Sequence, residues 1–162
     1  MQEQLRIRRR RDGTFDLDLP EEERDILRTL PAALREVVIG DDPAAERLFP
    51  PAHPEDPLRE DEYRRLTHEG LVGKRLAAIE VVEQTIDARR LDEDQLSAWL
   101  GALNDLRLVL GSRLELTEET GERELDPEDP RAPTMALYQY LTWLVDEAVE
   151  ALAIGLPEDG SW

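Results

Sequence analysis

The sequence predicts a mostly α-helical protein with a β-hairpin at its N-terminus. Long stretches carry leucine, valine and alanine at intervals of three and four, which places these side chains on one face of an α-helix. Near the N-terminus, apolar residues instead alternate on both sides of Asp12-Gly13, as in a hairpin. A chain of 162 residues also suits one domain. We therefore expect a single domain over 1–162, with a hairpin at 5–19 and four or five helices within 20–156.

The stretch 91–116 is predicted to be the central helix of the bundle. Asp92 is the predicted N-cap, with Gln95 at the glutamine position of a capping box. Such a wide apolar face predicts that several other elements pack against this helix. The face is formed by Leu96, Trp99, Leu103, Leu106, Leu110 and Leu114.

Arg107 breaks the pattern of this helix, because it falls inside the apolar face, while Asn104 and Asp105 point towards the polar side. A buried guanidinium is costly unless a carboxylate pairs with it. Two interpretations follow. Arg107 either reaches solvent or pairs with an acidic residue of an adjacent helix, or it binds an anion in a cleft.

The predicted hairpin has strands of opposite charge. Its first strand carries Arg8, Arg9, Arg10 and Arg11 next to Arg6, and its second strand carries Asp16 and Asp18. One interpretation is a solvated ribbon whose cross-strand ion pairs protect its edges from pairing with other chains. The other is a β-ribbon that contacts phosphates or an acidic partner.

The first predicted helix begins after Pro20 with three glutamates and ends at Gly40, and Pro31 is expected to kink or split it. The proline-rich connection 41–57 is expected to contain one helical turn at 44–48. A long helix is predicted from Pro57 to about Ala88. Within it, the small residues Gly70, Gly73 and Ala77 are expected to lie against another helix that approaches closely.

The last part of the chain is predicted to contain an acidic connection and a final helix. The segment 117–133 is rich in acids and prolines and reads as an exposed loop. The final helix is expected from Thr134 to about Leu152, with an apolar face wide enough to leave a homodimer open.

The net charge of -18 argues against a broad nucleic-acid surface, because duplex binding requires arginine and lysine to neutralise phosphates. A basic partner fits this charge better.

There is no cysteine, which excludes disulfides, thiolate catalysis and thiol-based redox sensing. No segment is apolar over the roughly 20 residues that a membrane span needs, and the N-terminus lacks the apolar core of a signal peptide. We therefore expect a cytoplasmic protein.

Catalytic and metal-binding motifs are absent from the sequence. His53 and His68 are too few and too far apart for a metal cluster, and Val72 stands where HExxH requires its second histidine. Gly73-Lys74 is followed by Arg75 in place of the Ser or Thr of a phosphate loop. We therefore expect no metal, no cofactor and no enzymatic activity.

Three blocks of the sequence resemble a small actinobacterial family. They are WLGALNDLRLVLGSRLELTEE at 99–119, RLFPPAHPEDP at 47–57 and EYRRLT at 62–67. This family was long labelled as a domain of unknown function and is often encoded beside the ClpS adaptor of the Clp protease. Some of its members are described as oxidative-stress transcriptional regulators.

The resemblance implies a regulator of transcription under stress that acts through a protein partner, with a sigma factor or polymerase component suspected. Two alternatives stay open: an accessory of Clp proteolysis, and direct DNA binding through the arginine-rich hairpin. Without cysteine, any oxidant sensing belongs to a partner. The motif carries over Trp99, Asn104, Asp105, Arg107 and Arg113, of which Trp99 is expected to fill the core and Asn104 and Asp105 to make local polar contacts.

Overall fold

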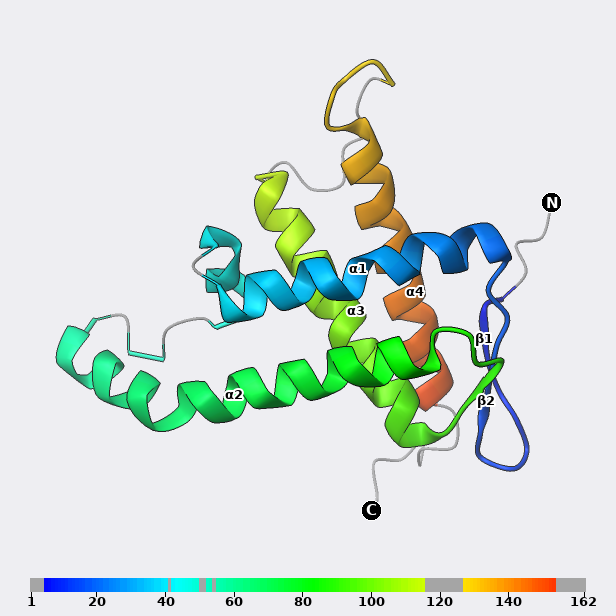
Figure 1. Ribbon diagram of the computed structural model, residues 1–162, viewed down its shortest axis with the longest axis horizontal. Helices are drawn as coiled ribbons and strands as arrows, with labels where there is room; N and C mark the ends of the chain where they lie inside the picture. The colour runs from blue at the N-terminus through cyan, green and yellow to red at the C-terminus, as the bar shows by residue number, and fades with distance from the viewer. Residues whose placement is uncertain (1–4, 41, 50–51, 54, 116–126, 154–162) are drawn as a thin grey trace.

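The computed structural model describes residues 5–40, 42–49, 52–53, 55–115 and 127–153 and confirms a mostly helical fold with an N-terminal hairpin (Figure 1). The described elements, in chain order, are β1 (Ile7–Arg9), β2 (Phe15–Leu17), α1 (Glu21–Ile39), the 3₁₀ helix η1 (Pro43–Arg47), α2 (Pro57–Thr85), β3 (Arg90–Leu91), α3 (Glu93–Arg113) and α4 (Ala132–Ala153).

The predicted hairpin is present and gains a third strand. β1 and β2 pair antiparallel with Ile7 opposite Leu17, and Gly13 adopts a φ of 86° in the turn. β3 then pairs with β2, with Phe15 opposite Leu91. Because side chains alternate along a strand, Ile7, Phe15, Leu17 and Leu91 all face the core.

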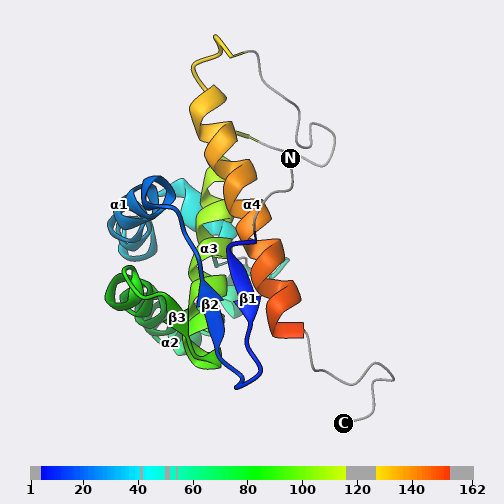
Figure 2. The same ribbon diagram turned by 90° about the vertical axis from the view of Figure 1, so that its right-hand side faces the viewer.

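α3 is the central helix, as predicted. It lies between α4 on one side and α1 and α2 on the other (Figure 2). Asp92 and Gln95 form the predicted capping box, in which each side chain accepts a hydrogen bond from the backbone N–H of the other residue. Trp99 is 1% exposed and its indole N–H donates to the Thr85 hydroxyl at 2.7 Å.

Pro31 was expected to kink or split the first helix. It does not split it, because α1 runs unbroken from Glu21 to Ile39, and the kink stays a prediction. Pro31 is buried against a small apolar space between α1, α2 and α3. Proline has no backbone N–H, so α1 lacks one intrahelical hydrogen bond at this position. The buried side chains of Leu27 and Leu34, on either side of the proline, stabilise the helix there by packing in the core.

The prediction for Gly70 and Gly73 is also wrong. Both glycines are exposed, and a Cβ atom at either position would meet no other atom within 4 Å. The reason is that α2 packs on the other long helices through its C-terminal part, where Ile79 and Val82 are buried. The N-terminal part of α2 projects beyond the other helices (Figure 1).

The structure describes parts of the two predicted connections. The expected helical turn at 44–48 is η1, whose N-cap Asp42 accepts a hydrogen bond from the backbone of Ala44 at 2.8 Å. Most of the acidic connection, 116–126, and the C-terminal residues 154–162 lie outside the described residues.

Candidate functional site

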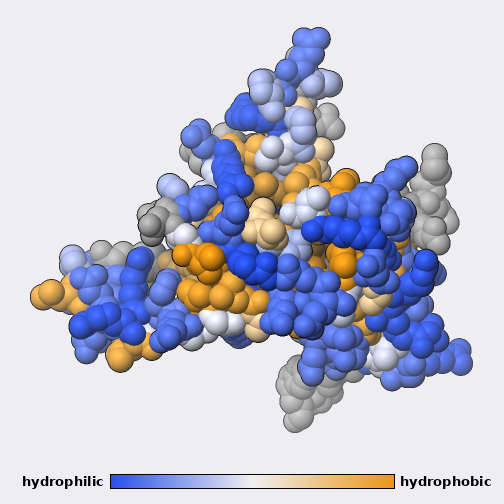
Figure 3. Space-filling view, viewed as in Figure 1, coloured by the Kyte–Doolittle hydropathy of each residue, from blue (hydrophilic) through white to orange (hydrophobic). Residues whose placement is uncertain are grey.

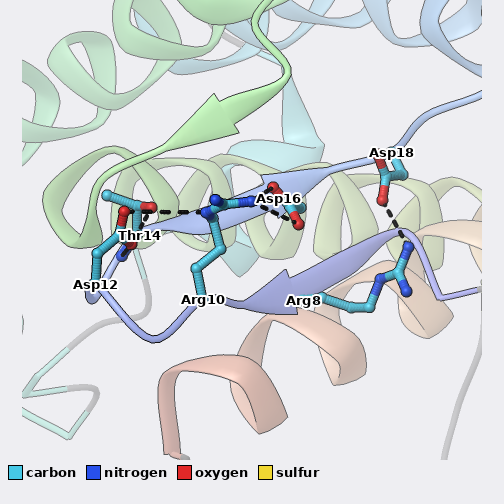
Figure 4. Close-up of polar contacts among 6 residues, drawn as sticks. All are labelled: Arg8, Arg10, Asp12, Thr14, Asp16 and Asp18. Carbon is cyan, nitrogen blue, oxygen red and sulfur yellow. Dashed lines mark hydrogen bonds and ion pairs between the residues drawn. The ribbon is translucent and has the colours of Figure 1, made fainter.

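The predicted arginine-rich hairpin contains cross-strand ion pairs on its outer face. Arg8 donates to Asp18 at 2.9 Å and Arg10 donates to Asp16 at 3.1 Å (Figure 4). Asp12 accepts hydrogen bonds from the backbone and hydroxyl of Thr14 in the turn, and these two bonds lower its pKa. These contacts correspond to the first interpretation of the hairpin, a ribbon that pairs its own charges.

Two other arginines of this sheet have no carboxylate partner among the described residues. Arg9 lies over the Phe15 ring at 5.6 Å, which shields this core residue from solvent. Arg11, at the start of the turn, is exposed and makes no hydrogen bond or ion pair there. The four hairpin arginines, with Asp12 and Asp16, line a shallow hollow of about 520 Å³.

The structure separates the motif residues of α3 instead of bringing them to one site. Arg107 is half-buried and donates to Asn104 of its own helix at 2.7 Å, and within the described residues it forms no ion pair. Arg113 is the last residue of α3 and pairs with Asp42, the N-cap of η1, at 3.0 Å. Trp99 belongs to the core.

The prediction that Asp105 points to the polar side of α3 is wrong, since its side chain is buried and the residue is 6% exposed. Both of its carboxylate oxygens accept from Arg75 of α2 at 2.9 Å. Burial raises the pKa of Asp105 in spite of the neighbouring guanidinium, which acts in the opposite direction. The spacing of Ala98, Ala102 and Val109 around Asp105 marks a second apolar face that could have indicated its burial.

Arg75 was not predicted, although it joins three elements. Besides Asp105 of α3, it donates to the carbonyl of Leu48 at 2.6 Å and its guanidinium lies 5.1 Å from the Phe49 ring. This arginine therefore fixes α2 to α3 and to the end of η1, at the position where the projecting N-terminal part of α2 begins.

A second polar cluster, also missed by sequence reasoning, joins β1 and α1 to α4. Arg6 pairs with Glu23 at 2.7 Å and stacks on Trp143 at 5.1 Å, while the Tyr140 hydroxyl donates to Glu23 at 2.7 Å. Burial opposes ionisation of Glu23, but the hydrogen bonds from Arg6 and Tyr140 lower its pKa overall. Burial is the main cause that raises the pKa of Tyr140, and the hydrogen bond to Glu23 is the next largest.

Glu147 of α4 completes this junction. It is 6% exposed, and one carboxylate oxygen accepts from the backbone N–H groups of Arg6 at 2.8 Å and Ile7 at 3.1 Å. The apolar face of α4, which suggested a homodimer, is thus used at least in part within the chain, against α3 and β1. The oligomeric state stays a prediction.

We expect Glu147→Leu to lower the free energy of unfolding by about 2 kcal/mol, because two backbone N–H groups lose their acceptor. Glu147→Gln keeps an acceptor oxygen and should lose less than half as much. Urea unfolding of the three proteins measures these differences. Equal losses for leucine and glutamine would contradict the role of the carboxylate oxygen as an acceptor.

Among the described residues, the two most exposed large apolar side chains lie on the projecting part of α2, residues 57–74, which we call the α2 arm. Within it, Glu60 is the only buried residue. Leu58 is 83% and Leu66 79% exposed, and Tyr63 and Leu71 are partly exposed as well. Figure 3 shows apolar surface at this projecting end of the molecule.

A groove of about 540 Å³ runs between the α2 arm and η1. Aromatic rings line it, and the rings of Phe49 and His68 are in contact, with centroids 5.3 Å apart. Arg75 is also among the lining residues. Exposed leucines next to a groove of mixed polarity are typical of surfaces that bind another protein.

The described residues contain no cluster of three or more histidine, aspartate or glutamate side chains arranged to hold a metal ion. None of the described helices has a stretch long and apolar enough to cross a membrane.

Comparison with known proteins places the chain in a family. The model of the family described as "Domain of unknown function (DUF2017)" matches residues 4–152. The chain belongs to the DUF2017 family. No solved structure matches this DUF2017 chain.

The DUF2017 chain also resembles curated proteins named "Oxidative stress regulator AosR". Those of Mycobacterium bovis and of Mycobacterium tuberculosis strain H37Rv are each 33% identical to it over 128 residues. The alignment covers 68% of this chain and 58% of each relative. The chain therefore spans somewhat more than half the length of these relatives.

Proposed function

We propose that this DUF2017 protein is a regulator of the stress response that acts by contacting a protein partner and not by catalysis. The name of its curated relatives supports a regulatory role. The exposed leucines of the α2 arm are the observation that carries the proposed mechanism, because several exposed apolar side chains on one segment mark a surface that binds another protein.

The proposed partner belongs to the transcription machinery, with a sigma factor or a polymerase subunit as the candidates. The chain has no cysteine, so a response to oxidants would have to originate in that partner. The alternative partner is the Clp proteolytic machinery, for which this protein would act as an accessory.

The test is recovery of partners by the tagged protein from a native extract, with and without peroxide. Leu66→Glu should abolish recovery of the partner, because it places a charge in the apolar interface. Its matched control is Ile26→Glu, which makes a similar change at an exposed position of α1 outside the arm. We expect Leu66→Glu to change the free energy of unfolding by no more than about 0.5 kcal/mol.

Recovery of a sigma factor or polymerase subunit by the wild type and by Ile26→Glu, with loss in Leu66→Glu, would support the proposal. Recovery of Clp subunits instead would favour the alternative. If Leu66→Glu recovers the same partners as the wild type, the α2 arm is not the interface.

A further inference from the structure

We propose that the outer face of the three-stranded sheet binds an acidic protein segment, rich in aspartate and glutamate, through Arg11 and Arg90. The core side chains of the sheet point inward, so Arg8, Arg10, Asp16 and Arg90 lie on its outer face. None of the described helices lies over this face (Figure 2).

The arginines of this face are not equivalent. Arg8 and Arg10 already use their guanidinium groups to neutralise Asp18 and Asp16 (Figure 4). Arg11 is exposed next to them, and Arg90 stands opposite Asp16 on β3. Arg11 and Arg90 are both exposed, and neither donates a side-chain hydrogen bond to a described residue. Arg90 acts on Asp12 only through its charge, so both guanidinium groups keep donors for an external carboxylate.

The charge of this face is opposite to that of the chain. Four arginines and two aspartates line the hollow, which gives it a charge of +2, whereas the chain as a whole carries -18. At physiological salt, charges more than about 8 Å away are largely screened, so a ligand at the hollow responds mainly to the local arginines. A carboxylate-bearing segment is the complementary ligand.

An acidic protein segment fits this face better than nucleic acid does. A duplex carries a negative charge about every 1.7 Å and would extend past the hollow over the acidic remainder of the molecule. Asp12, Asp16 and Asp18 are also interspersed among the arginines, where they would repel a continuous row of phosphates. A protein segment presents separate carboxylates and also N–H groups that can donate to these aspartates.

Fluorescence anisotropy of a fluorescein-labelled oligoglutamate peptide at physiological salt, about 0.15 M, tests the proposal with the full chain. We expect the double variant Arg11→Gln/Arg90→Gln to bind the peptide about fivefold more weakly than the wild type, since two exposed ion pairs are lost. The matched control is Arg59→Gln/Arg65→Gln, which removes two exposed arginines from the α2 arm and should bind like the wild type. Binding should weaken as salt is raised.

Three outcomes would overturn the proposal: no binding of the peptide at physiological salt, an equal loss in the control variant, or tighter binding of a labelled DNA duplex than of the peptide. Leu66→Glu should bind the peptide normally. Loss of partner recovery through the α2 arm and loss of peptide binding at the sheet are therefore measured separately, and either proposal can fail alone.

Discussion

Arg75→Met is expected to lower the free energy of unfolding by about 3 kcal/mol near neutral pH, because it leaves a buried carboxylate without its partner. The guanidinium supplies both hydrogen bonds to Asp105 that the described residues provide, and it also donates to the Leu48 carbonyl. Methionine fills a similar volume but donates nothing. Urea unfolding measures the loss, with the slope of the free energy of unfolding against urea concentration expected to be the same in both proteins.

The loss in Arg75→Met should also depend on pH. Burial already raises the pKa of Asp105, and removing the adjacent positive charge raises it further. An acid with a higher pKa in the folded chain binds its proton more tightly there. It therefore costs no stability below its ordinary pKa of about 3.9, and an increasing amount as the pH rises to its folded-state value. Up to the folded-state pKa of Asp105 in the wild type, both proteins should lose stability in parallel; the difference between variant and wild type should therefore grow only above that pKa, up to the higher folded-state pKa in the variant.

The control for Arg75→Met is Arg113→Met, which breaks the ion pair with Asp42. Because this pair is largely exposed, its loss should cost less than about 1 kcal/mol. A loss for Arg75→Met that is as small, or that does not change with pH, would contradict the assignment of Asp105 as a buried, costly carboxylate.

Trp99→Ala is expected to lower the free energy of unfolding by about 4 kcal/mol, through lost apolar contacts and the cavity left behind. Trp99 is at the centre of the packing, where α3 meets α1 and α2. Trp99→Phe keeps most of the contacts and loses the hydrogen bond to Thr85, and should cost about 1–2 kcal/mol. Urea unfolding of both variants checks the order, and similar losses would show that the hydrogen bond matters more than packing.

The sequence predicts the helices and strands well where interactions between residues close in the chain determine them. The capping box of Asp92 and Gln95 involves residues three apart, and the hairpin turn depends on Asp12-Gly13 and the strands beside it. The periodicity of leucine in α3 likewise predicted its buried face, from Leu96 to Leu110. Each of these features is specified within a few consecutive residues.

Local reasoning failed at Asp105 and at the glycines of α2 for one reason. The helical period gives the side of a helix on which a residue lies. It does not give which other helix or strand packs against that side. α3 is surrounded on several sides, so Asp105 is buried although it lies away from the main leucine face. α2 is covered only near its C-terminal end, so Gly70 and Gly73 remain open to solvent.

The class of fold, the hairpin and the central helix follow from propensities and spacings along the chain, so the amino-acid sequence is enough to predict them. Which charges are paired and which remain available depends instead on how the helices and strands pack. Asp105 and Arg75 are 30 residues apart, and Glu147 lies 141 residues from the amide of Arg6 that it accepts from. Such contacts form when packing brings distant segments together, so no local pattern specifies them.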